Sequence, residues 1–389
     1  MARRRSAGWS PDNGRDGNVP APRTMERRMA MRSDRIAASL AFSLVAGTVF
    51  AFSQVTPLVF RDAAGRTIRL EKPPQRILAI GHGPQIIAHL MFMFPESRSR
   101  FIGWERRGSK ASEFIPLIDA DFDKRVFPDP NTGVEEVAAL HPDLVLMRGF
   151  TTDPKGDALE KVGIPVVYLG LENPEQYRKD IELVGLILGS SGRAGEINRF
   201  YRDRLDRVES GLAGLENDKK PTVFLAMTMS RGGRIAVRVP AASWIQTVMV
   251  RLAGGKPVWA EGAADTSGWT VVNLEQIARW NPDRIVLVVW HSLDPGQTLA
   301  DLGADEMWRE LRAVRGGDMR AFPSDIYGWD TPDPRWILGL TWLAKTFHPD
   351  RFLGTDMNAE IRSFYRELYG MSPEDIEAKI LPSIRTDYR

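Results

Sequence analysis

The chain has 389 residues, enough for two domains of ordinary size, and its hydrophobic, charged, Gly and Pro contents are those of a globular protein. It contains no Cys, which excludes disulfides, thiolate metal sites, thiol catalysis and a lipidated N-terminal Cys. The formal net charge is +2, but residues 1–53 hold nine Lys and Arg against four Asp and Glu, which leaves 43 against 46 in the remainder. The larger part therefore has no basic excess, and we expect no nucleic-acid partner.

Residues 1–53 are typical of an exported leader with an N-terminal extension. Arginines between positions 27 and 35 precede an uncharged run over 36–52, and small residues stand at Ala51 and Ser53. This order predicts a signal peptide that is cleaved near Ser53, and hence a periplasmic protein. An uncleaved membrane anchor is the alternative, although the run is short for a span. A membrane-tethered interaction protein would follow from that alternative.

Short strand patterns then alternate with helical patterns. Residues 58–70 predict a small hairpin around Ala64-Gly65. Further strands are expected over 76–80, 100–104, 143–148 and 165–169, with helices over 85–94 and 134–140. This alternation predicts a parallel α/β lobe over 54–173.

Residues 174–217 form a different segment, which is charged, amphipathic and mostly helical. Apolar residues at helical spacing predict a helix over 193–215, about 35 Å long at 1.5 Å per residue, that can cross between two lobes. The alternation then restarts over 218–389 and predicts a second α/β lobe with closing helices. Its strands are expected over 222–227, 284–290 and 319–322, and its helices over 242–253, 274–280, 334–346 and 358–369.

One unit occurs twice. The stretch 135–146 is similar to 275–286, 140 residues later, and each copy has an acidic helix start, a Pro-Asp turn and a strand pattern. Two such units, one on each side of a long helix, indicate two similar lobes.

Several short motifs carry a resemblance to a known family. They are Asp62-Ala-Ala-Gly-Arg-Thr-Ile, Pro73-Pro-Gln-Arg-Ile-Leu-Ala, Leu140-His-Pro-Asp-Leu-Val-Leu, Gly163-Ile-Pro-Val-Val-Tyr, Gly185-Leu-Ile-Leu-Gly189, Asn281-Pro-Asp-Arg-Ile-Val and Leu338-Gly-Leu-Thr-Trp-Leu-Ala-Lys-Thr-Phe-His-Pro-Asp. In this order, over 58–370, they resemble the helical-backbone solute-binding proteins of ABC importers for iron-siderophores, haem and cobalamin. The resemblance implies two Rossmann-like α/β lobes joined by a single long rigid helix, with a ligand cleft between them. It also implies an ABC permease dimer at the inner membrane as partner, and we expect a monomer.

Candidate ligand-binding residues follow the predicted strands, because ligands of parallel α/β lobes bind beyond the carboxyl ends of the strands. The set is rich in aromatic and basic side chains: His82, Trp104, Arg148, Met229, Arg231, Trp269, Trp290, His291, Tyr327 and Trp329. Aromatic walls and guanidinium groups suit a bulky chelate with anionic oxygens. We expect Arg148 and Arg231 to bind ligand oxygens, one from each lobe. The alternative is a core position for each Trp and a surface charge for each Arg.

A ferric siderophore is the metal chelate that this set favours, and no cofactor is expected. His82 and His291 follow strands of different lobes and are candidates for direct metal ligation, with hydrogen-bonded loop histidines as the alternative. Haem with Tyr327, His82 or His291 as axial ligand, cobalamin, and an oxyanion such as molybdate or tungstate stay open.

Glu135 and Glu275 occupy the same place in the repeated unit. The family resemblance implies that such glutamates dock onto basic pockets of the permease, where paired charges fix orientation and speed encounter. The alternative is that they are helix N-terminal acids favoured by the macrodipole.

Catalytic motifs are missing from the sequence. Gly103-x4-Gly108-Ser109-Lys110 departs from a P-loop in its last two residues, and neither His-Glu-x-x-His nor Gly-x-Ser-x-Gly occurs. We therefore expect a binding protein and not an enzyme, with a chelatase-like activity as the remaining enzymatic alternative.

Overall fold

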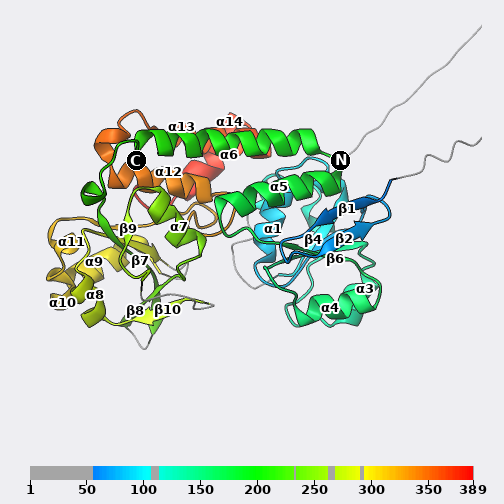
Figure 1. Ribbon diagram of the computed structural model, residues 1–389, viewed down its shortest axis with the longest axis horizontal. Coiled ribbons are helices and arrows are strands. Elements are labelled where there is room, and N and C mark those ends of the chain that lie inside the picture. Colours follow the sequence, from blue (N-terminus) through cyan, green and yellow to red (C-terminus); the bar gives the residue numbers. More distant parts are fainter. Residues whose placement is uncertain (1–55, 107–113, 232–233, 262–267, 290–292, 389) are drawn as a thin grey trace, which may run out of the picture. The chain divides into compact units, whose positions relative to one another are not determined.

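The structure, a computed structural model, describes residues 56–388 apart from 107–113, 232–233, 262–267 and 290–292 (Figure 1). The predicted signal peptide and N-terminal extension over 1–53 lie outside the described residues. Along the chain, an N-terminal α/β lobe is followed by a pair of long helices and then by a C-terminal α/β lobe with closing helices. The predicted two-lobe α/β fold class is therefore confirmed. No helix in the described part of the chain is long and apolar enough to cross a membrane.

The N-terminal lobe is built on a four-stranded parallel sheet. Its elements are β1 Leu58–Arg61, β2 Thr67–Leu70, β3 Ile77–Ala79, α1 Pro84–Met91, α2 Ser97–Arg100, β4 Phe101–Trp104, the short turns η2 Ile115–Leu117 and η3 Phe122–Lys124, α3 Val134–Ala139, β5 Leu144–Arg148, α4 Pro154–Lys161 and β6 Val166–Leu169. The strand order is β4-β3-β5-β6, and β1 and β2 form the predicted separate hairpin. Gly65 turns this hairpin with a φ of 75°, a conformation that glycine adopts without strain.

Both faces of the N-terminal sheet are buried. Along β3 the side chains alternate, so that Ile77 and Ala79 belong to the main core whereas Leu78 belongs to a second cluster on the opposite face. The same alternation places Leu146 in the main core and Val145 in the second cluster. A sheet that is covered on both faces requires continuous apolar strands, which explains the short hydrophobic runs in the sequence.

Two helices, α5 Pro174–Leu188 and α6 Ser191–Gly211, lead from the first lobe to the second. Asn173 begins α5, because its side chain accepts a hydrogen bond from the Gln176 backbone N–H at 2.9 Å. Gly189 ends α5 in the left-handed conformation, with a φ of 69°. Figure 1 shows α6 reaching from the side of the N-terminal lobe to that of the C-terminal lobe, as the helix predicted over 193–215 requires.

The C-terminal lobe holds a mixed sheet. Its elements, after the turn η4 Asn217–Lys219, are β7 Thr222–Arg231, β8 Arg234–Val239, α7 Ile245–Leu252, β9 Lys256–Pro257, β10 Thr270–Val272, α8 Leu274–Trp280, β11 Arg284–Val289, α9 Pro295–Ala304, α10 Glu306–Arg309, α11 Arg312–Arg315, β12 Met319–Ala321, α12 Trp336–Phe347, η5 Pro349–Arg351, α13 Met357–Tyr369, α14 Pro373–Asp375, η6 Ile376–Ile380 and η7 Leu381–Ser383. The order is β10-β8-β7-β11-β12, with β9 also paired to β7. Strands β7, β11 and β12 run parallel as predicted, whereas β8 and β10 are antiparallel additions.

The repeated sequence unit forms the same structure in both lobes. Helix α3 leads into β5 as α8 leads into β11. The residues that end the two helices, His141 and Asn281, both have positive φ, at 49° and 41°. The following aspartates then bind the first strand of their own sheet: Asp143 accepts from the Arg76 backbone N–H at 2.7 Å, and Asp283 accepts from that of Thr222 at 2.8 Å. The Pro-Asp turn therefore fixes the register of neighbouring strands.

Candidate ligand-binding site

The loop after β3 brings the backbone close to charged side chains. Gly83 stands just before α1 with a φ of 64°, and a β-carbon there would lie 2.9 Å from the Arg148 guanidinium. The Gly81 N–H donates to the Glu105 carboxylate at 3.1 Å, and Lys155 donates to the same oxygen at 3.4 Å. Glycine at position 83 therefore permits Arg148 to lie against the start of α1.

Arg148 lies at the end of β5 and forms an ion pair with Glu172, the residue before the α5 cap. Both side chains are nearly buried, with exposed fractions of 11% and 13%. The backbone N–H of Ile245, the first residue of α7 in the C-terminal lobe, also acts on the Glu172 carboxylate and favours its charged form. Burial raises the pKa of Glu172, and this effect exceeds the lowering by Arg148. The pair therefore lies near the start of a helix of the C-terminal lobe.

The loop between β12 and α12 contributes two further polar groups. The Tyr327 ring packs edge-on against His89 of α1, with 5.2 Å between ring centroids. Burial raises the pKa of Tyr327, and the nearby charge of Arg148 only partly opposes this. Asp330 is buried beside the Gln246 side chain of α7, and burial raises its pKa to about 6. The positive charge of Arg148 in the N-terminal lobe therefore acts on Tyr327 of the C-terminal lobe.

Aromatic side chains that remain partly exposed are found on both lobes. Trp269 packs edge-on against Trp244, with ring centroids 5.8 Å apart. Phe150, two residues beyond β5, is 46% exposed. Met229 on β7 is partly exposed, and His82 after β3 is exposed. These side chains remain accessible for contact with a ligand.

Two of the sequence-predicted residues are corrected by the structure. Trp104 is fully buried, stacked on Phe101 at 6.0 Å and edge-on to Phe127 at 4.9 Å. Trp329 is also fully buried, and its indole N–H donates to Asp325 at 2.9 Å. Both are core residues with no surface for a ligand, because the neighbouring elements close over them. Trp290, His291 and the side chain of Arg231 lie outside the described residues.

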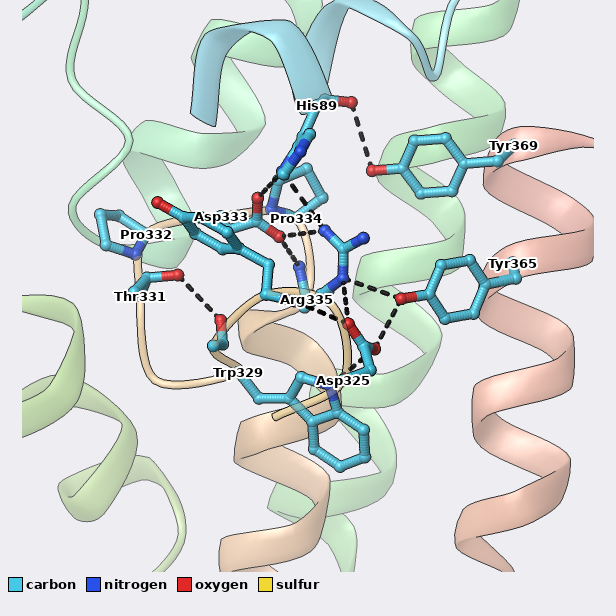
Figure 2. A network of polar contacts seen from close by, with 12 residues as sticks. His89, Asp325, Trp329, Thr331, Pro332, Asp333, Pro334, Arg335, Tyr365 and Tyr369 are labelled. Carbon is cyan, nitrogen blue, oxygen red and sulfur yellow. Dashed lines mark hydrogen bonds and ion pairs between the residues drawn. The ribbon is translucent and has the colours of Figure 1, made fainter. Parts of the chain in front are cut away.

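A buried polar network connects the lobes and was missed in the sequence (Figure 2). Its centre is Arg335, which donates to Asp333 at 2.8 Å and to Asp325 at 2.9 Å. His89 of α1 pairs with the other oxygen of Asp333. Burial lowers the pKa of His89, although Asp333 opposes this, so we assign a neutral imidazole with its proton on Nδ1. The sequence feature that could have revealed the network is the segment 325–335, in which Asp and Arg side chains stand close together around Pro332 and Pro334.

The hydroxyl groups of three tyrosines tie this loop to the surrounding helices, and that of a fourth ties α13 to α1. Tyr365 donates to Asp325 at 2.5 Å, and Tyr369 donates to the His89 carbonyl at 3.2 Å. Tyr177 of α5 and Tyr201 of α6 donate to the carbonyls of Pro332 and Pro334, at 3.0 and 2.7 Å. The loop that carries Tyr327 is therefore held by the linking helices, by α1 of the N-terminal lobe and by α13. Figure 2 shows the contacts with His89 of α1 and Tyr365 of α13.

Glu172, Gln246 and Asp330 were also missed as site residues. Glu172 follows the strand predicted over 165–169 by three residues, so the strand-end rule applied to that strand would have found it. Gln246 lies in the helix predicted over 242–253, but β8, the strand before that helix, was not predicted, so the strand-end rule did not single out Gln246. Within the described residues, no group of three or more His, Asp or Glu side chains could hold a metal ion.

The two glutamates of the repeat are both exposed, each in the first turn of its helix. Helices α3 and α8 lie on the same side of their lobes in Figure 1, away from α6. Glu135 and Glu275 are therefore accessible on a side of the lobes that the linking helices do not cover.

Comparison with known proteins agrees with this architecture. An uncharacterised ABC transporter substrate-binding lipoprotein, YvrC of Bacillus subtilis, is 22% identical over 304 residues, 77% of this chain and 88% of its own. The molybdate-binding protein MolA of Haemophilus influenzae is 21% identical over 344 residues, 82% of this chain and 93% of its own. The structure of MolA with molybdate superposes with a TM-score of 0.65 at 19% identity, covering 81% of this chain and 98% of MolA. A periplasmic solute-binding protein of Veillonella parvula gives a TM-score of 0.66 at 24% identity, covering 85% and 98%.

The family assignment comes from the sequence pattern of the periplasmic binding proteins. This pattern matches residues 119–326, more than half of the chain. The relatives are substrate-binding proteins of ABC transporters and not enzymes, and they support a periplasmic location. The chain therefore belongs to the periplasmic binding protein family, with the two-lobed helical-backbone architecture of ABC-importer binding proteins.

Proposed function

We propose that this protein delivers a metal chelate with anionic oxygens, foremost a ferric siderophore, to the permease of an ABC importer. The observation that carries the proposal is Arg148, a nearly buried cation against the start of α1, the helix whose His89 packs on Tyr327 of the other lobe. A guanidinium suits carboxylate, hydroxamate or catecholate oxygens. Partly exposed aromatic side chains at Trp244, Trp269 and Phe150 supply apolar surface for a bulky ligand.

An oxyanion such as molybdate is the second candidate. It is favoured by the similarity to MolA, which extends over most of both chains and whose structure was determined with molybdate. A haem ligand is less favoured through Tyr327, because burial raises the pKa of its hydroxyl and so disfavours the phenolate that would bind iron. Cobalamin is tested alongside these ligands.

The experiment titrates the exported protein with a panel of ligands. Binding is measured by the change in tryptophan fluorescence and by the shift in the thermal unfolding temperature. The panel is a ferric trihydroxamate, a ferric tricatecholate, haemin, cyanocobalamin and sodium molybdate. We expect saturable quenching and a raised Tm with a ferric chelate, and Arg148→Ala should weaken this binding about tenfold or more. Arg362→Ala is the matched control, because Arg362 is an exposed arginine on α13. Stabilisation by molybdate alone would replace the chelate with the oxyanion, and no response to any member would overturn both.

We also propose that Glu135 and Glu275 dock the protein on its permease. Both are exposed at equivalent positions in the two lobes, so a two-fold related pair of basic pockets could receive them. Glu135→Ala combined with Glu275→Ala should lower cellular uptake of the bound ligand about tenfold or more, while its affinity for the purified protein stays unchanged. The control combines Glu136→Ala with Glu306→Ala, two exposed glutamates outside the pair. Equal uptake by both double variants would contradict docking through the repeat.

A further inference from the structure

Two N–H groups from different lobes favour the charged form of the Glu172 carboxylate. Arg148 at the end of β5 forms an ion pair with it, and the first backbone N–H of α7, that of Ile245, lowers its pKa as a nearby N–H does. The side chain of Trp244, the residue before α7, makes no capping hydrogen bond. Glu172 therefore offers negative charge to a helix start that its own neighbouring residue does not cap.

These two donors together have the chemistry of an anion site. A guanidinium binds carboxylate-like oxygens strongly, and the N–H groups at a helix start favour negative charge. The occupant here is itself an anion, and it is nearly buried, with an exposed fraction of 13%. Burial outweighs Arg148 and raises the pKa of the Glu172 carboxyl, so its charge is held in an unfavourable environment. A carboxylate in this position regains hydration when it is released.

We infer that Glu172 is a built-in competitor for the anionic oxygens of the ligand: its carboxylate occupies the site that Arg148 and the start of α7 offer to them. A ligand binds by displacing this carboxylate from Arg148, so Glu172 sets the affinity of the site and selects ligands whose oxygens bind the guanidinium more strongly. The inference rests on the proposed function in one respect, namely that Arg148 contacts the ligand. It adds a specificity-determining residue.

The test is the affinity of Glu172→Gln for sodium molybdate and for a ferric tricatecholate, measured by fluorescence titration and calorimetry. The amide oxygen can still accept from Ile245, but the variant no longer neutralises Arg148. We expect tighter binding of at least one of these anions, about tenfold or more. Glu175→Gln is the matched control, because Glu175 is an exposed glutamate on α5 that pairs with Arg178, and it should leave the affinity unchanged.

Two further variants separate competition from positioning. Glu172→Asp keeps the charge but shortens the side chain, so it should also tighten binding because one carboxylate no longer reaches both donors. In an Arg148→Ala background, Glu172→Gln should give no gain, since nothing is left to compete for. Unchanged or weaker binding by both Glu172 variants would overturn the inference and make Glu172 a residue that positions Arg148.

The failure of this inference is distinguishable from the failure of the proposed function. If the unaltered protein binds an anion of the panel but the Glu172 variants do not gain affinity, only the inference fails. If the unaltered protein binds neither anion, gained binding by Glu172→Gln supports the inference, and the lack of a gain overturns it together with the proposed ligand class.

Discussion

Asp180 of α5 is a buried carboxylate that holds the crossover after β6 in place. It accepts hydrogen bonds from the backbone N–H groups of Gly170 and Leu171 at 2.9 and 2.8 Å, and from the Gln176 side chain at 2.9 Å. Burial nevertheless raises its pKa to about 7. The ionised form is therefore tolerated near neutral pH only with a loss of stability, although the hydrogen bonds that it accepts fix the residues before Glu172.

The raised pKa of Asp180 predicts a pH-dependent stability. Between pH 4 and 7, Asp180 is protonated in the folded protein but ionised in the unfolded chain. The contribution of its buried neutral form to the free energy of unfolding is therefore complete below about pH 4 and is lost as the pH rises through 7. The loss has an upper bound of roughly 4 kcal/mol. Asp180→Asn should remove it, because the amide oxygen can accept from Gly170 and Leu171 while Gln176 turns its own amide.

Urea unfolding at pH 5 and pH 8 measures this effect. Between pH 5 and pH 8, the free energy of unfolding of Asp180→Asn should fall less than that of the unaltered protein. A smaller fall should remain in this variant, because the pKa of Asp330 is also raised, to about 6. Asp203→Asn on α6 makes the same charge change at an exposed position and serves as the control. Equal losses in the unaltered protein and in Asp180→Asn would contradict the assignment.

Individual site residues were predictable only in part. The strand-end rule places Arg148 and Tyr327 near each other, but Trp104 and Trp329 obey the same rule and are fully buried. Position after a strand decides which edge of the sheet a side chain reaches, whereas exposure depends on neighbours that are distant in sequence. For Trp104 these neighbours include Phe122 and Phe127. The sequence around Trp104 does not predict these contacts.

At the scale of elements, the sequence was most informative where one pattern repeats. The helix, Pro-Asp turn and strand occur twice, and both copies fold alike, because each aspartate binds the backbone of its neighbouring strand. The helix α4 was not predicted, although Asp153 before Pro154 is a common helix start and caps the Lys155 N–H at 2.8 Å. Strands β8 and β10 also escaped prediction, because antiparallel additions do not follow the alternation of strand and helix that identified the parallel strands β7, β11 and β12.

The linking segment shows what helical periodicity reveals and what it leaves out. The apolar spacing predicts the long helix α6, but the close packing of α5 on α6 depends on Gly185, where a β-carbon would lie 2.5 Å from that of Ala194. The sequence does not show which residue of the neighbouring helix Gly185 faces, so this close contact could not be predicted and is seen only in the structure. The pair α5 and α6 is therefore joined by packing as well as by the short connection at Gly189.

At the scale of the whole binding unit, the buried network centred on Arg335 fixes how one lobe meets the other. Arg335 is fully buried between Asp325 and Asp333, and Asp333 in turn binds His89 of the N-terminal lobe (Figure 2). The same loop carries Tyr327, so the network that joins the lobes also positions a group beside the proposed site. Interactions between lobes and the geometry of the site are thus parts of one structure.

The network predicts that Arg335 is critical for stability. Arg335→Met should lower the free energy of unfolding by about 3–5 kcal/mol, because it leaves two buried carboxylates without a cation. Combining it with Asp325→Asn and Asp333→Asn should recover part of this loss, since the carboxylate charges are then also removed. Arg362→Ala breaks the exposed pair with Glu377 and should change stability far less than Arg335→Met.

Urea unfolding of these variants decides whether the network acts as one charged unit. A loss in Arg335→Met that is no larger than in Arg362→Ala would show that packing alone holds the loop. A loss that Asp325→Asn and Asp333→Asn fail to reduce would assign the effect to the volume of the arginine side chain and to its stacking over Phe114, 4.4 Å from the ring centroid, in place of its charge. We expect the two Asn substitutions to recover part of the stability that Arg335→Met loses. Removal of the buried cation leaves the carboxylates of Asp325 and Asp333 uncompensated, whereas asparagine has a similar shape and carries no charge.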